Sequence, residues 1–418
     1  MRIRLLTLAL FAGALPLTAF AASQSLLPPQ AGDLVPTLVH ARIASPAATV
    51  SSRLSPAAPQ VHEERQPIQV SWALNPADPL DAAPQPVRRE SREYWREVSD
   101  TELQRGVELS TTAPGAIIRL SPGQGSARIQ AADMRLQIGG KQFDGRTATR
   151  HVADAAQLQA AGMDATDASL ALQLRPDLGA GRTTLQAATA RGRYVVYVYE
   201  PQSPLVVEAQ ADRPELLLGG SLQVSVNLRD GAQPRALGEA TGVLRSPDGE
   251  TTPLRYRRQA GGGFVAIASP AKQAAVPGLW EAQSIVTGTD ASGREVRRNV
   301  TTTFAVAVPD ARFVGTAEPR RATDGGIDIA FSVDVQSGSR YAVSGVLYGR
   351  NAEGAVLPAA YAQSAAWLEA GNGELHLRFD PASLRGLAPP YELHDLRLQD
   401  QPAMGLVERR ATALRFSL

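Results

Sequence analysis

The sequence Ile327-Asp-Ile-Ala-Phe-Ser-Val-Asp-Val335 alternates large apolar residues with small or polar ones over its whole length. Successive side chains of a β-strand point to opposite faces, so the apolar side chains of this segment share one face. Strict alternation therefore predicts a strand with one buried face and one solvated face. Strands of this kind are typical of two-layer β-sandwiches.

The same period recurs upstream. Leu222–Leu228 alternates in this way, and Ser246-Pro-Asp-Gly249 predicts a turn between two further short strands. Short strands separated by frequent turns predict an immunoglobulin-like β-sandwich over residues 205–309, with Trp280 in its core. Residues 310–418 are predicted to form a second, C-terminal β-sandwich.

Residues 65–204 are predicted to form an N-terminal β-rich domain with two short helices. Ile68–Leu74 alternates as its first strand, and Ser99-Asp-Thr-Glu102 is a capping box that begins a helix before Gly106. Ala153–Ala161, followed by a glycine, predicts the second helix. The expected fold class is mostly β: this domain followed by two immunoglobulin-like sandwiches.

The N-terminus has the pattern of a secretory signal peptide over residues 1–21. Two arginines precede the apolar run Leu5–Leu17, and Ala19-Phe-Ala21 offers a cleavage site. Residues 22–64 are rich in proline and alanine and are predicted to form a disordered tether. We expect an exported protein, periplasmic or secreted, without an integral membrane segment after cleavage.

Composition excludes several classes of function. The chain has 418 residues, with 42 Lys and Arg against 41 Asp and Glu, so no basic surface for nucleic acid is indicated. It has no cysteine, which excludes disulfides, thiolate nucleophiles and lipidation at a cysteine. Gly-x-Ser-x-Gly and the phosphate-binding glycine motifs are absent in the required context. We therefore expect no cofactor, no metal and no assigned catalytic residue.

Three histidines are candidates for chemistry: His151, His376 and His394. His151 precedes Asp154, so an imidazole oriented by a carboxylate is one interpretation and a surface histidine beside a helix is the other. His376 is predicted to lie on the polar face of a strand. His394-Asp395 interrupts an alternating pattern and predicts a β-bulge.

A basic and aromatic cluster is the candidate binding site: Arg92, Tyr94, Trp95 and Arg96. Such side chains can bind a sugar ring or a partner's carboxylates by stacking and by forked hydrogen bonds. The alternative is a domain edge in which Trp95 packs inward and the arginines stay solvated.

Several stretches together resemble an exported bacterial family known as domain of unknown function 4785. They are Ser91-Arg-Glu-Tyr-Trp-Arg-Glu-Val98, Leu103–Gly115, Tyr197-Val-Tyr-Glu-Pro-Gln-Ser203, Gly278-Leu-Trp-Glu281, Thr287–Gly293 and Arg298. The resemblance spans about residues 65–418. It implies export and an N-terminal β-rich domain followed by two immunoglobulin-like modules, and it implies no catalytic residue.

The expected function is a non-catalytic binding or scaffold protein of the bacterial envelope or secretome. Its partner would be a protein or a glycan. The alternative is a secreted hydrolase with its site in the N-terminal domain and the sandwiches as spacers. Fold alone does not choose between these, because sandwiches serve both roles.

Overall fold

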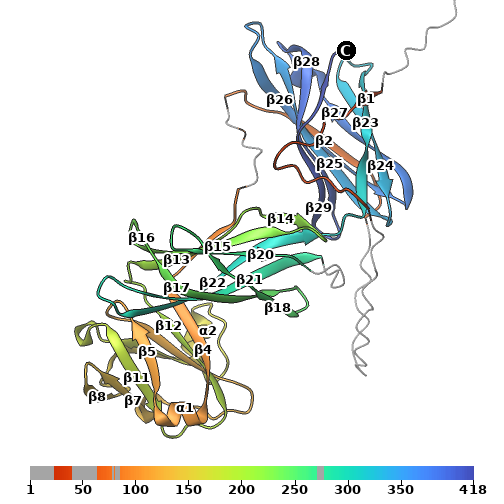
Figure 1. Cartoon of the computed structure of the whole chain (residues 1–418). Coiled ribbons are helices and arrows are strands. Elements are labelled where there is room, and N and C mark those ends of the chain that lie inside the picture. The colour runs from red at the N-terminus through yellow and green to blue at the C-terminus, as the bar shows by residue number, and fades with distance from the viewer. Residues whose placement is uncertain (1–22, 40–63, 78–79, 81–84, 271–276) are drawn as a thin grey trace, which may run out of the picture.

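The computed structural model describes residues 23–39, 64–77, 80, 85–270 and 277–418 (Figure 1). The predicted signal peptide, and residues 40–63 of the predicted tether, lie outside these ranges. The described chain consists mainly of antiparallel strands with two short α-helices, so the predicted mostly-β fold class is confirmed. Within it, no helix has the length and hydropathy needed to cross a lipid bilayer.

The N-terminal domain is formed by two antiparallel sheets around one shared core. One sheet has the order β4 (Glu93–Ser99), β12 (Arg193–Tyr199), β6 (Ile117–Pro122), β10 (Leu170–Leu174), β9 (Thr149–Asp154). The other has the order β5 (Val107–Thr111), β11 (Gly181–Ala187), β7 (Met134–Ile138), β8 (Lys141–Asp144). Leu172 of the first sheet and Leu136 of the second are both fully buried between them.

Both predicted helices are present. In α1 (Asp100–Arg105) the Ser99 hydroxyl accepts a hydrogen bond from the Glu102 N–H, and the Glu102 carboxylate accepts one from the Ser99 N–H. Gly106 ends the helix with a φ of 110°, which glycine adopts without steric cost. The second helix is α2 (Ala155–Ala160). Three short 3₁₀ turns are η1 (Ala131–Asp133), η2 (Pro176–Leu178) and η3 (Pro381–Leu384).

The middle domain also has two facing sheets. The first has the order β19 (Arg257–Arg258), β20 (Phe264–Ala268), β15 (Leu222–Asp230), β13 (Leu205–Ala211), β3 (Arg88–Ser91), with β16 (Gln233–Arg235) paired to β15. The second has the order β14 (Glu215–Leu217), β22 (Glu295–Ala307), β21 (Gly278–Thr289), β17 (Leu237–Arg245), β18 (Thr251–Leu254). Trp280 is buried in the core between them, as predicted.

The C-terminal domain contains the alternating stretch 327–335 as strand β24. One sheet has the order β1 (Gln24–Ser25), β23 (Ala311–Arg321), β24 (Ile327–Val335), β27 (Gly371–Phe379). The other has the order β2 (Ile68–Ala73), β26 (Val356–Leu368), β25 (Ser339–Arg350), β28 (Ala388–Asp400), β29 (Gly405–Phe416). The apolar face of β24 is completely buried against the second sheet, so the predicted alternation positions this core.

The chain divides into these domains differently from the predicted boundaries. We expected residues 65–204 to form one unit, but β2 pairs with β26 in the C-terminal domain and β3 pairs with β13 in the middle domain. Figure 1 shows β2 among the strands of the C-terminal domain, far from β4. Alternation identifies a strand, but its hydrogen-bonded neighbour is a non-local property that the local pattern does not contain.

Part of the predicted tether is also structured. Gln24 and Ser25 pair with β23, and Leu26 enters the C-terminal core with only 8% of its surface exposed. Leu34 then forms an isolated bridge with Arg409 of β29. A few apolar residues within a segment rich in proline and alanine are therefore sufficient to fix it once a preformed sheet offers free edges.

Replacing Leu26 by alanine should destabilise the C-terminal domain by about 2–3 kcal/mol, because a buried apolar contact is lost and a cavity is left. Differential scanning calorimetry would record a melting transition lowered by several degrees. Leu38→Ala is the control, since Leu38 belongs to the same segment but is 66% exposed. Equal effects of the two substitutions would contradict the packing of this segment.

Candidate functional site

A fully buried ion pair lies where the N-terminal and middle domains meet. Arg298 of β22 places Nη1 2.7 Å from Oε2 of Glu200, which directly follows β12, and both side chains have 0% exposure. Burial lowers the pKa of the Arg298 guanidinium, and the carboxylate of Glu200 opposes that change by stabilising the positive charge.

The remaining donors of Arg298 are used within the same junction. Its Nη2 donates to the Thr112 hydroxyl at 3.1 Å and to the Ser203 hydroxyl at 3.0 Å, and its Nε donates to the Leu205 carbonyl at 3.3 Å. The guanidinium therefore connects residues of the N-terminal domain to β13 of the middle domain.

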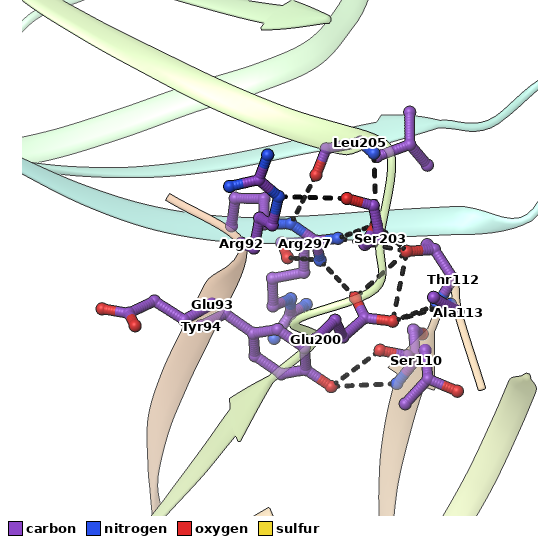
Figure 2. A network of polar contacts seen from close by, with 12 residues as sticks. Arg92, Glu93, Tyr94, Ser110, Thr112, Ala113, Glu200, Ser203, Leu205 and Arg297 are labelled. Atoms are coloured by element: carbon purple, nitrogen blue, oxygen red, sulfur yellow. Dashed lines mark hydrogen bonds and ion pairs between the residues drawn. The ribbon is translucent and has the colours of Figure 1, made fainter. Parts of the chain in front are cut away.

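The carboxylate oxygens of Glu200 also have their hydrogen-bond partners within the junction (Figure 2). Its carboxylate accepts hydrogen bonds from the backbone N–H groups of Thr112 and Ala113, and from the Thr112 hydroxyl. Several donors, one of them a guanidinium, compensate a buried carboxylate for the water that it loses. Both side chains of the pair are closed to solvent, so the network is a structural joint.

Two further side chains of β22 form hydrogen bonds near this joint. The Asn299 side-chain amide donates to the carbonyl of Trp95 at 3.1 Å, and the Thr302 hydroxyl donates to the carbonyl of Val87 at 3.2 Å. The first bond joins β22 to β4 of the N-terminal domain, and the second joins β22 to the residue before β3 within the middle domain. The two domains are therefore joined along β22 at Arg298 and at Asn299.

Sequence reasoning did not select Thr112, Glu200, Ser203 or Arg298 as a group. Each lies in one of the stretches that carry the family resemblance, which are distant in the sequence and converge here. Their common location in these stretches was the one feature of the sequence that could have grouped them. Spacing could not reveal it, because the contacts cross two domains.

The predicted binding cluster is divided by the structure. Tyr94 is 2% exposed, and its hydroxyl donates to the Ser110 carbonyl and accepts from the Ser110 N–H, each at 3.0 Å. Arg92 donates from Nε to the Ser203 carbonyl at 3.1 Å. Burial raises the pKa of Tyr94, so this hydroxyl remains protonated at neutral pH. Arg92 and Tyr94 are therefore parts of the joint.

Arg96 and Trp95 are adjacent residues of β4, so their side chains point to opposite faces of the sheet. Arg96 lies on the same side as the buried Tyr94 and forms an ion pair with Glu102 at 3.1 Å. Trp95 points outward and is 40% exposed. The structure does not bring the four predicted residues together on one surface.

Trp95 instead belongs to a row of side chains on the outer face of the five-stranded sheet. It lies opposite Tyr197 of β12, and Tyr197 lies opposite Arg119 of β6. The Arg119 guanidinium stacks 4.9 Å from the centre of the Tyr197 ring. Its Nη1 donates to the Asp164 carbonyl at 3.4 Å, and its Nε is buried without a hydrogen-bond partner among the described residues. The row therefore offers aromatic surface beside a guanidinium.

A second row runs beside the first and crosses all five strands: Glu93, Tyr199, Ile117, Gln173 and His151. The Tyr197 hydroxyl donates to the Glu93 carboxylate, which links the two rows. Burial and this bond raise the pKa of Tyr197, so the hydroxyl stays protonated and acts as a donor. We call the two rows together the aromatic face.

The structure does not support the pairing of His151 with Asp154. They are separated by three positions on β9, so alternation directs their side chains to opposite faces. The Asp154 carboxylate caps α2 by accepting from the Gln157 N–H at 3.0 Å. His151 lies at the opposite edge of the sheet from Trp95, roughly 19 Å away at about 4.8 Å per strand.

The two C-terminal histidines each contact carboxylates. His376 is within 2.7 Å of Glu374 and 3.3 Å of Asp328, on the polar face as predicted. His394 lies at a register shift of β28 and contacts Glu392 at 3.0 Å, so the predicted bulge is confirmed. In the described part of the chain, no three potential ligands converge as a metal site requires.

Two family profiles match the chain. The N-terminal domain of the domain-of-unknown-function family DUF4785 matches residues 59–200, and its C-terminal domain matches residues 310–417. The chain belongs to the DUF4785 family. No curated protein matches it.

A solved structure of a DUF4785 family protein from Legionella pneumophila is similar over 84% of this chain and 93% of that chain. The sequences are 22% identical and the TM-score is 0.65, so the likeness shows a shared fold. A tandem repeat of a large adhesion protein has 12% identity, covers 79% of this chain and 73% of its own, and has a TM-score of 0.16. An adhesin that helps an Antarctic bacterium bind ice has 13% identity, covers 72% of this chain and 69% of its own, and has a TM-score of 0.17. TM-scores this low do not establish a shared fold.

Removing one partner of the buried pair should be costly. Arg298→Ala leaves the Glu200 carboxylate buried without a counter-charge, so we expect a loss of about 3–5 kcal/mol in the free energy of unfolding. Urea denaturation measures this loss. Arg298→Met combined with Glu200→Leu should recover part of it, because no uncompensated charge remains, although the Thr112 and Ala113 N–H groups lose their acceptor.

The control for that experiment is Arg297→Ala. Arg297 is the neighbouring residue of β22 but is 35% exposed and pairs with Glu295 at the surface, where an ion pair contributes little. We expect a change below about 0.5 kcal/mol. If Arg298→Ala were no more destabilising than this control, the joint would not depend on the pair.

Proposed function

We propose that this DUF4785 member is an exported, non-catalytic binding protein of the bacterial envelope or secretome. Its working surface is the aromatic face of the N-terminal domain. The observation that carries the proposal is the row of Trp95, Tyr197 and Arg119, which places two aromatic rings beside a guanidinium on the outer face of the sheet, with Trp95 40% exposed.

The chemistry of this row favours a glycan over a flat protein surface. Apolar faces of sugar rings pack on aromatic side chains, and hydroxyl or carboxylate groups accept bonds from an arginine fork. Glu93 and Gln173 in the second row add acceptors and donors beside the rings. Because the side chains stand on strands, the backbone fixes their spacing.

The buried joint supports the same function by holding the aromatic face at a fixed orientation to the middle domain. A binding surface at one end of a multidomain chain is presented reliably only if the domains do not reorient freely. The pair of Arg298 and Glu200, with its saturated hydrogen bonds, supplies that constraint.

Trp95→Ala tests the binding surface directly. We expect this variant to lose at least about tenfold in affinity for bacterial envelope polysaccharide, measured by co-sedimentation of the purified protein with isolated cell-wall sacculi. The stacking surface is removed while the backbone bond from Asn299 to residue 95 is retained.

Arg96→Ala is the matched control, because Arg96 is the next residue and points to the other face of β4. It should bind as well as the unaltered protein. Equal losses in the two variants would favour the contiguous cluster of the sequence prediction. If neither variant lost binding, the aromatic face would not be the working surface.

Export rests on the pattern of residues 1–21, in which two arginines, an apolar run and Ala19-Phe-Ala21 follow one another. The mature protein is expected to begin near Ala22. Terminal sequencing of protein recovered from the periplasm or medium measures this. Retention of Met1 in that fraction would contradict cleavage.

A further inference from the structure

Strand β2 forms an exposed edge of the C-terminal domain. It lies at the end of its sheet and pairs with β26 alone among the described strands. Ile68, Val70 and Trp72 share one face and are 55%, 42% and 49% exposed. An apolar stripe of this kind on an edge strand is unusual, because an exposed edge is a template for pairing with another chain.

The usual protection of edge strands is missing from β2. Its sequence Ile68-Gln-Val-Ser-Trp-Ala73 contains no charged residue and no proline, and its register with β26 is unbroken. The opposite edge of the same sheet is covered, since Leu27 donates its N–H to the Ala413 carbonyl at 2.8 Å and Leu34 bridges Arg409. The protein therefore covers one edge with its own N-terminal segment, while no described segment covers the other.

The free edge presents a defined set of main-chain groups. The Leu74 N–H donates to the Ala359 carbonyl, so Leu74 belongs to a hydrogen-bonded pair with β26. Such pairs alternate along an antiparallel ladder, so the even-numbered residues of β2 direct their N–H and C=O groups toward β26. Gln69, Ser71 and Ala73 direct theirs toward the free edge.

The outward edge of β2 is accessible. No described strand lies beside it, so an incoming strand can approach β2 without displacing a folded element of the described chain. A groove of about 430 Å³ opens at the start of β2, where Pro67–Gln69 and Ser364–Ala366 of β26 face Glu374–His376 of the other sheet.

We propose that β2 pairs antiparallel with β2 of a second copy of this chain, so that two five-stranded sheets join into one. With Ser71 opposite Ser71 of the second copy, every outward-pointing group of Gln69, Ser71 and Ala73 gains a partner. The same register places Val70 opposite Trp72 and Ile68 opposite Leu74 of the second copy.

The sequence of β2 makes a second copy the fitting occupant. A two-fold axis through Ser71 pairs apolar residues only with apolar residues, and uncharged polar or small residues only with one another. Pairs of an aromatic with a β-branched residue, such as Trp72 with Val70, are among the stabilising cross-strand combinations. A shift by one residue would place the apolar stripe against the polar face, which fixes the parity of the register.

Analytical ultracentrifugation of the purified full chain tests the proposal. We expect a concentration-dependent dimer, and we expect Ser71→Pro to weaken its Kd at least about tenfold. Proline removes the central outward N–H without removing a bond to β26, and edge strands accept proline at such positions. A protein that stays monomeric up to about 1 mM, or a dimer unaffected by Ser71→Pro, would overturn the proposal.

A spin label keeps the proposal testable if the proline variant misfolds. The chain has no cysteine, so Val70→Cys carries the only label. In the proposed register the two labelled positions are diagonal neighbours, roughly 7–8 Å apart between their Cβ atoms, so dipolar broadening of the spectrum is expected. Thr251→Cys, at the exposed start of β18, is the control without broadening. Equal spectra at the two positions would rule out this pairing.

Discussion

The relation between the N-terminal and middle domains depends on one buried ion pair. Arg298 and Glu200 have no contact with water, and removing each charge from water costs several kcal/mol before their attraction is counted. That cost is offset only where every remaining donor and acceptor has a partner. The partners come from β22, from the chain after β12 and from residues 112–113, so all three must occupy their places at once.

Because of this requirement, the main effect of the joint is to fix the orientation of the two domains relative to each other. A hydrophobic contact of the same area would constrain the orientation less, because the hydrophobic effect is not directional. A saturated guanidinium does not tolerate sliding, since a small displacement leaves a buried charge with an unpaired hydrogen. The polar junction thus defines a single orientation for the aromatic face relative to the middle domain.

Local patterns predicted the local structure well. The alternation of residues 327–335 gave a buried strand, and the capping box at Ser99 gave a helix with the expected start. Both features depend on residues a few positions apart. Neither the partner of β2 nor the partner of β3 could be found in this way, because strand pairing is a property of residues far apart in the sequence.

The candidate site was predicted only in part for a related reason. Trp95 and Arg96 are neighbours in sequence, and without a strand assignment at 93–99 they were grouped by adjacency. Strand geometry separates neighbours and unites residues on different strands, as it does for Trp95 and Tyr197. The buried network could not be predicted from the sequence, because its residues come from four separate segments that meet only in the folded structure.

The path of the chain through the three domains has a consequence for folding order. The chain contributes β1 and β2 to the C-terminal domain, then β3 to the middle domain, and completes the N-terminal domain before it returns through the other two. Gln24 can pair only after Ala317 has been synthesised, and Ile68 only after Ala365. The domain whose strands are synthesised first is therefore the last to be completed. Contacts this distant in sequence slow folding. Until β26 is made, the apolar strand β2 has neither of its edges paired, which makes the nascent chain vulnerable to association at that segment.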